Sequence, residues 1–325
     1  MNAASVRVGQ PRAHEHGPRD SPSVLVVRAG ALGDVLLLRR AVAGLRRTGR
    51  EVVLLAPSRS GEAILGPGGG EATRLVAWDG PDVATLLGGG PPPSALAEEL
   101  ERVEAVIAYT RQADVLAALG GHARQVIAVD PRPGPGTHAS AWLASPLAAL
   151  GVDPAPDPPV LVPRAEEQVR AASLTASLPA GFLAVHPGSG ARAKNWPPER
   201  FAQLVREWAA GGPWLLVEGP ADEEPVQALC ALPGARRAQD LPARMLGAML
   251  ARAGLYVGND SGVSHLAAAF GAPTLALFGP TDPTVWGPIG PRVTALRSPE
   301  GTMASLEVAS VLTAAARLAS PPRRD

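Results

Sequence analysis

Apolar positions along the chain fall into short continuous runs, separated by stretches in which apolar residues recur at helical spacing. Val24–Arg28 and Glu51–Ala56 are continuous runs, and Pro57 ends the second. Residues 34–47 between them predict a helix, with these residues on one face: Val35, Leu38, Val42 and Leu45. Further buried strands are expected at Val103–Tyr109 and Gln125–Val129. This alternation is typical of an α/β fold in which helices cover both faces of a parallel sheet.

A second series of the same kind follows a proline-rich segment. Residues 153–163 hold five prolines, which stiffen a chain and interrupt helices and central strands. The segment is interpreted as a domain linker, the alternative being a long surface loop inside one domain. The predicted strands beyond it are Phe182–His186, Trp214–Val217, Leu255–Val257 and Thr274–Phe278. The predicted helices are Pro197–Ala210, Glu223–Leu232, Ser261–Phe270 and Ser305–Leu318.

These patterns predict four regions. Residues 1–22 are expected to be a disordered leader, because they contain prolines and lack the apolar core of a signal peptide. Residues 23–155 and 164–304 are expected to form two Rossmann-like domains, and 305–325 a helix and tail. Ligands of open α/β sheets bind outside the carboxyl ends of the strands. We therefore expect the two domains to face a central cleft that holds the substrate.

Composition narrows the classes of function. The 325 residues suit two domains, and 30 basic and 30 acidic residues argue against a nucleic-acid partner. Cys230 is the one cysteine, so no intramolecular disulfide can form and a reducing compartment is favoured. No apolar run reaches the roughly 20 residues of a membrane-spanning helix. A cytoplasmic protein is expected.

The first candidate motif is Arg28–Ala41, where a strand end meets a helix. Gly30 and Gly33 are expected to form a tight turn that lets a ligand approach the backbone. Asp34 lies at the helix start, where an acid also stabilises the helix by roughly 0.3–1 kcal/mol without any other role. The spacing is not the G-x-G-x-x-G dinucleotide fingerprint, and the second strand ends without an acidic residue. A nicotinamide-dependent oxidoreductase is therefore disfavoured, and no cofactor is expected.

The second and third motifs lie in the other half of the chain. In Val185–Phe201, the amides near Gly188, the Ser189 hydroxyl and Lys194 are candidates to bind phosphates, the alternative being a solvated lysine. Gly258–Pro283 contains a strand-to-helix turn whose candidate residues are Asp260, Ser261, Gly262 and His265. The amides after an N-cap serine form a ready anion site. The alternatives are a helix cap and a core histidine. A serine hydrolase is disfavoured because the G-x-S-x-G elbow is missing.

Taken together, the three motifs resemble the heptosyltransferases of glycosyltransferase family 9. The resemblance covers roughly Val24–Pro291, and its most specific parts are Gly33–Asp34, His186–Pro197 and Asn259–Pro283. It implies the GT-B fold and metal-independent, inverting transfer of a heptose from ADP-heptose to the inner core of lipopolysaccharide. An alternative is a nucleotide-sugar-binding member of the family with another donor or acceptor, or without transferase activity.

The resemblance also implies roles for individual residues. Asp34 matches the general base, Ser189 and Lys194 match contacts to the donor phosphates, and Glu223 matches a contact to the ribose. The donor-binding segment is matched by Asp260, Ser261, Gly262 and His265. The chain departs from some relatives in having Gly188–Ser189 in place of two threonines, and serine for threonine at position 261. The predicted first helix and the residues just beyond it also carry five arginines, which either make a peripheral contact with the inner membrane or form a solvated helix face. They are Arg39, Arg40, Arg46, Arg47 and Arg50.

Overall fold

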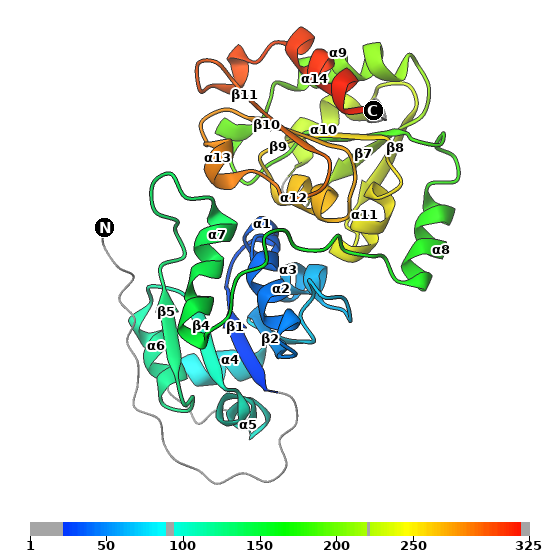
Figure 1. The fold of residues 1–325 in the computed structure, drawn as a ribbon. Coiled ribbons are helices and arrows are strands. Elements are labelled where there is room, and N and C mark those ends of the chain that lie inside the picture. Colours follow the sequence, from blue (N-terminus) through cyan, green and yellow to red (C-terminus); the bar gives the residue numbers. More distant parts are fainter. Residues whose placement is uncertain (1–21, 89–93, 220–221, 320–325) are drawn as a thin grey trace, which may run out of the picture. The chain divides into compact units, whose positions relative to one another are not determined.

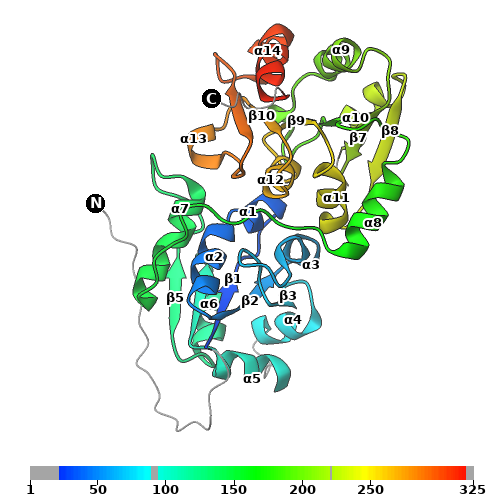
Figure 2. The ribbon, with the colours of Figure 1, turned by 45° about the vertical axis from the view of Figure 1, so that its right-hand side comes forward.

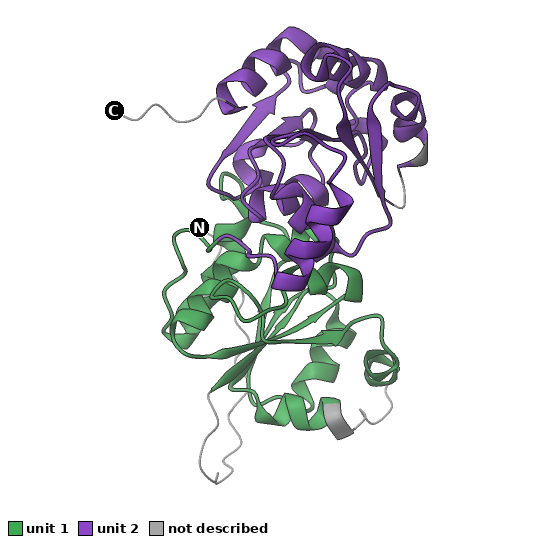
Figure 3. Ribbon diagram, turned by 90° about the vertical axis from the view of Figure 1, so that its right-hand side faces the viewer, with its two compact units in different colours: residues 1–159 green, residues 160–325 purple. Residues whose placement is uncertain are grey.

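The computed structural model describes residues 22–88, 94–219 and 222–319. The predicted leader, apart from Pro22, lies outside the described residues, as do residues 320–325 of the predicted tail. The chain divides into two compact units, Met1–Pro159 and Val160–Asp325 (Figure 3). The division falls within the proline-rich segment 153–163.

Within its described residues, unit 1 is built on a five-stranded parallel sheet with the order β3-β2-β1-β4-β5 (Figure 1). The strands are β1 Ser23–Val27, β2 Glu51–Ala56, β3 Arg74–Ala77, β4 Ala105–Tyr109 and β5 Val126–Val129. The helices are α1 Leu32–Leu36, α2 Arg39–Arg47, α3 Ser58–Gly61, α4 Pro81–Leu87, α5 Ser94–Arg102, α6 Ala113–Gly120 and α7 Ala139–Ala144. The sheet face under α4, α5 and α6 forms an apolar core that includes Leu25, Val53 and Val106.

The predicted helix over residues 34–47 is split in two. Leu37 and Leu38 form a turn between α1 and α2, where the Leu38 amide donates to the Val35 carbonyl at 3.1 Å, three residues back. Both residues keep right-handed helical angles, so the chain continues in nearly the same course. All four residues of the predicted apolar face are buried, so the helical periodicity is correct and the continuity of the helix is wrong.

Within its described residues, unit 2 has a six-stranded parallel sheet with the order β11-β10-β9-β6-β7-β8 (Figure 2). The strands are β6 Leu183–His186, β7 Trp214–Glu218, β8 Ala235–Gln239, β9 Leu255–Asn259, β10 Thr274–Phe278 and β11 Val293–Arg297. The helices are α8 Ala165–Leu174, α9 Pro198–Ala209, α10 Glu223–Cys230, α11 Ala243–Leu250, α12 Gly262–Ala269, α13 Pro283–Trp286 and α14 Val308–Ala319.

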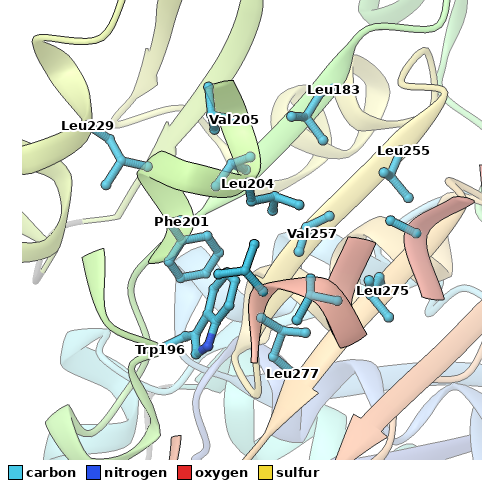
Figure 4. Packing of buried hydrophobic residues seen from close by; sticks show 14 of the residues in the cluster. Leu183, Trp196, Phe201, Leu204, Val205, Leu229, Leu255, Val257, Leu275 and Leu277 are labelled. Atoms are coloured by element: carbon cyan, nitrogen blue, oxygen red, sulfur yellow. The ribbon is translucent and has the colours of Figure 1, made fainter. Parts of the chain in front are cut away.

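One face of this sheet carries the main core of unit 2, under α9, α10 and α14 (Figure 4). Trp196 is fully buried there and meets Phe201 edge-on, with ring centroids 4.9 Å apart. Its indole N–H donates to the Leu306 carbonyl at 2.8 Å, so the one polar atom of the ring is satisfied. Each unit thus has a parallel sheet whose strands alternate with helices, which confirms the predicted α/β fold class.

Three of the four arginines of α2 bind the proline-rich segment. Arg39 donates to the Pro159 carbonyl, Arg40 to Ala155 at 2.7 Å and Arg47 to Asp153 at 3.2 Å. Burial lowers the pKa of Arg39 to about 10, although the charge of Glu71 opposes the change. The predicted solvated face is therefore wrong for Arg39, which is buried in the fold of its own unit. In the described part of the chain, no helix has the length and apolar character that crossing a membrane requires.

Candidate functional site

Each sheet has one point at which the order of its strands reverses. In unit 1 the chain leaves β1 towards β2 and returns on the other side at β4. In unit 2 the corresponding neighbours are β6 and β9. Loops that leave the carboxyl ends of such strands diverge to opposite faces and open a crevice that favours ligand binding. The three predicted motifs follow β1, β6 and β9, so all of them start at these two points.

Asp34 lies in the first turn of α1, directly after β1. Its Oδ1 pairs with Arg28 Nη2 at 2.5 Å, and its Oδ2 accepts from the Ala31 amide at 3.0 Å. About a third of the side chain is exposed. Gly30 is required here, because a Cβ at that position would lie 2.6 Å from Asp34 Cβ. Gly33, predicted as a turn residue, lies inside α1 instead.

Arg28, the ion-pair partner of Asp34, was not among the site residues predicted from the sequence. The residue is buried, and its Nε has no hydrogen-bond partner among the described residues. Burial raises the pKa of the neighbouring Tyr109 phenol, and the charge of Arg28 opposes that rise. Arg28 therefore brings a fixed positive charge to the carboxyl end of β1, beside Asp34.

The loop after β6 is fastened at both ends by one side chain. Asn259, the last residue of β9, donates from Nδ2 to the Pro187 carbonyl at 2.7 Å and accepts from the Trp196 amide at 3.0 Å. Within the loop, Ser189 Oγ lies 2.7 Å from the Ala191 carbonyl and 2.6 Å from Asn195 Oδ1. Asn259 is fully buried, as expected for an amide that satisfies two backbone groups.

Lys194 and Asp260 form an ion pair at the carboxyl edge of the second sheet. Lys194 Nζ lies 2.8 Å from Asp260 Oδ2, and the Thr281 hydroxyl donates to the same oxygen at 2.7 Å. The carboxylate is buried, whereas the lysine side chain is 29% exposed. The second and third motifs, far apart in the sequence, therefore meet in space.

A buried chain of three polar side chains lies beside this pair. His186 Nε2 is 2.7 Å from Asp222 Oδ2, and His186 Nδ1 is 3.2 Å from Ser261 Oγ. Gly188 makes room for it, because a Cβ there would lie 1.7 Å from Asp222 Oδ1. The sequence predicted Gly188 only as a position where a phosphate can approach the backbone, and Asp222 was not predicted as a site residue.

The remaining predicted residues are near these groups. Gly262 opens α12, and His265 is buried one turn later with its amide 3.3 Å from the Ser261 carbonyl. Glu223 is the first residue of α10, but its side chain lies outside the described part of the structure. Among residues 22–88, 94–219 and 222–319, no group of three or more His, Cys, Asp and Glu is placed to hold a metal ion.

The sequence is similar to that of known heptosyltransferases over part of its length. The family model for glycosyltransferase family 9 (heptosyltransferase) matches residues 139–315, more than half of the chain. Lipopolysaccharide heptosyltransferase 1 of Salmonella typhimurium is 33% identical over 121 residues, which cover 36% of this chain and 38% of that protein. The alignment thus spans little more than a third of the relative's length.

Two solved structures share the fold over nearly the whole chain. The glycosyl transferase family 9 protein from Veillonella parvula has a TM-score of 0.75 at 19% identity, covering 92% of this chain and 97% of that one. E. coli heptosyltransferase WaaC with ADP has a TM-score of 0.69 at 20% identity, covering 91% and 99%. These likenesses establish the GT-B fold, and the family model, matched over more than half of the sequence, establishes that the chain belongs to glycosyltransferase family 9.

Proposed function

We propose that this chain transfers a heptose, or a related sugar, from ADP-heptose or a similar nucleotide-diphosphate sugar to a lipopolysaccharide core or another glycan. The observation that carries the proposal is the meeting of Lys194, Asp260 and the start of α12 at the reversal point of the second sheet. A lysine beside unshielded helix amides is a suitable place for a diphosphate, because both favour negative charge.

In this proposal, Lys194 neutralises the charge that develops on the departing nucleoside diphosphate. Asp260, whose carboxylate also accepts from the Thr281 hydroxyl, holds the lysine in place before the donor binds, and the partly exposed ammonium group can also bind a phosphate oxygen. Such preorganised electrostatic contacts usually make the largest contribution to transition-state stabilisation. Ser189, Gly262, His265 and Glu223 are proposed to complete the donor site.

Asp34 is proposed as the general base. It takes the proton of the acceptor hydroxyl while that oxygen forms a bond to the anomeric carbon. The bond from this carbon to the phosphate oxygen breaks on the opposite face, and its electron pair leaves with the diphosphate. The configuration is therefore inverted, and because a diphosphate leaves without protonation, one carboxylate suffices.

The proposal includes no metal ion, since Lys194 and the α12 amides supply the positive potential. It places the enzyme in the cytoplasm. No membrane contact is assigned to Arg39, Arg40 and Arg47, because these three already bind carbonyl groups of residues 153–159.

A thermal-shift panel of ADP-, GDP-, UDP- and dTDP-sugars tests the donor site first. Stabilisation by one of these classes is expected, with ADP-sugars the first candidates. Transfer from ADP-heptose to a heptose-free lipopolysaccharide core, in excess chelator, then tests the reaction. Binding without transfer or donor hydrolysis would leave a nucleotide-sugar-binding protein, and complete loss of activity in chelator would reject the metal-free mechanism.

A further inference from the structure

Three loops of unit 2 meet at one oxygen atom of Asp260. The Lys194 ammonium lies 2.8 Å from Asp260 Oδ2, and the Thr281 hydroxyl donates to the same atom at 2.7 Å. The three residues follow β6, β9 and β10, which are adjacent strands in the order β10-β9-β6. Only 8% of the Asp260 side chain is exposed, so these two contacts replace water that the carboxylate loses on folding.

The position of Thr281 is set by the backbone on either side of it. The Asp260 amide donates to the Leu277 carbonyl at 2.9 Å, which joins the turn after β9 to the last residues of β10. Asp282, the residue after Thr281, is the N-cap of α13, and its side chain accepts from the Thr284 amide at 2.9 Å. Thr281 is therefore held between a buried strand and a capped helix.

Thr281 cannot donate to a ligand while it donates to Asp260. A hydroxyl has one hydrogen, and the carboxylate takes it. The Lys194 ammonium has three hydrogens and, among the described residues, makes one hydrogen bond, to Asp260. Two N–H groups remain, on a side chain that is 29% exposed. The lysine can therefore contact a ligand directly, whereas Thr281 as a donor acts on a ligand only through the carboxylate.

Asp260 has two opposing effects on an anion bound beside it. It orients Lys194, but it also competes with a phosphate for the ammonium, because both groups are negatively charged acceptors. The Thr281 hydrogen bond limits this competition. Its length is that of a charge-assisted bond, and it occupies part of the accepting capacity of the oxygen that faces the lysine. It also fixes which carboxylate oxygen faces Lys194, since rotation of the carboxylate would break the bond.

We propose that Thr281 is a positioning residue for donor binding, which acts through Asp260 to keep Lys194 oriented and available to a phosphate group. The inference rests on the donor site proposed above. A purely structural role of the same hydroxyl predicts a loss of stability alone. The positioning role predicts a loss of affinity for a diphosphate, and this loss depends on the presence of Lys194.

Isothermal titration of ADP tests the proposal. Thr281→Val has nearly the shape of the wild-type side chain and lacks the hydroxyl. Its dissociation constant for ADP should rise about 3–10-fold, in the lower part of the range of couplings within one hydrogen-bond network. Thr281→Ser keeps the hydroxyl and should restore the affinity. Thermal unfolding shows whether each variant is folded, and Thr281→Ala is a second hydroxyl-free variant if valine disturbs the loop.

Two further measurements separate positioning from a structural role. Thr284→Val also removes a threonine hydroxyl from an aspartate, because Thr284 Oγ1 donates to Asp282 Oδ1 at 2.8 Å. Asp282 pairs with Arg297 and not with Lys194, so this variant should bind ADP as the wild type does. In the Lys194→Met background, removal of the Thr281 hydroxyl should add little to the loss of affinity, because the group that it positions is gone.

The outcomes distinguish this inference from the function on which it rests. If ADP does not bind the wild type, the donor site for an ADP-sugar and the inference both fall. If ADP binds, but Thr281→Val binds it as tightly as the wild type, the donor site stands and the positioning role is wrong. The positioning role is equally wrong if the losses caused by Thr281→Val and Lys194→Met simply add.

Discussion

The guanidinium of Arg28 holds the carboxylate of Asp34 through an ion pair of 2.5 Å between Nη2 and Oδ1. The Ala31 amide binds the other oxygen, so the orientation of the carboxylate is set before any ligand arrives. Each carboxylate oxygen accepts more than one hydrogen bond, and about a third of this side chain remains accessible. Asp34 can therefore accept a proton from a substrate hydroxyl without giving up either contact.

Asp34→Asn should lower the turnover number by about 10²–10⁴-fold, because general base catalysis contributes on that scale. The dissociation constant of the donor should change little, since Asp34 lies in unit 1 and the proposed donor site in unit 2. Steady-state kinetics and donor titration measure both. Asp114→Asn, which removes an exposed acid from the first turn of α6, is the matched control. A variant at position 34 that keeps most of its rate would exclude Asp34 as the base.

Lys194→Met should weaken binding of a nucleotide sugar by about 10–100-fold, since hydrogen bonds to charged groups are worth about 1.5–3 kcal/mol. The substitution keeps most of the alkyl chain and removes the charge. Arg192→Met is a suitable control, because Arg192 lies in the same turn and pairs with the exposed Glu224. Equal losses of affinity in the two variants would mean that the net charge of the loop matters, and that Lys194 has no specific role.

Gly188→Ala should destabilise unit 2 by about 1–3 kcal/mol, the usual cost of overpacking. Its Cβ would lie 1.7 Å from Asp222 Oδ1, so the carboxylate would have to move away from His186. Gly190→Ala changes the same loop at a position where a Cβ would meet nothing within 4 Å. Thermal unfolding should separate the two variants clearly. Identical melting temperatures would show that Asp222 moves without cost.

The pH dependence of unfolding should report the buried pair of Glu167 and Arg244. Burial opposes ionisation of Glu167, but hydrogen bonds from Arg244 and the Arg164 amide hold its pKa below the usual range. A lowered pKa contributes stability that is present above the ordinary value, about 4.3, and is lost as the pH falls through the folded value. Urea unfolding between pH 3 and 7 should show this loss in the wild type.

Glu167→Gln should remove most of that acid-dependent loss and lower the stability at pH 7 by about 1–3 kcal/mol. Glu166→Gln alters the exposed neighbour in α8 and should leave the profile unchanged. A wild-type profile that persists in Glu167→Gln would assign the acid sensitivity to other carboxylates.

The fold was predictable where strands are buried on both sides. Glu51–Ala56 and Thr274–Phe278 match β2 and β10 residue for residue, because their apolar runs are continuous. The strands β3, β8 and β11 were not predicted. All three lie at sheet edges and are partly exposed, so each includes a charged residue that interrupts the apolar pattern: Arg74 in β3, Arg236 in β8 and Arg297 in β11.

The candidate site was predictable only as three separate segments. Lys194 and Asp260 were both identified from their motifs, but nothing local to either segment shows that they form a pair across 66 residues. Asp222 was missed because its partner His186 lies 36 residues away, and only the order of the strands brings them together. Polar residues at the ends of neighbouring parallel strands were the available indication.

The two hydrogen bonds of Asn259 have a consequence for the energetics of binding. The loop between Pro187 and Trp196, which carries Ser189 and Lys194, is tied at both ends to a buried side chain at the end of β9. Its conformational entropy is therefore lost when the domain folds, and less remains to be lost when a ligand arrives. A loop preorganised in this way favours fast binding of the ligand to an unchanged loop conformation over binding in which the loop folds around the ligand.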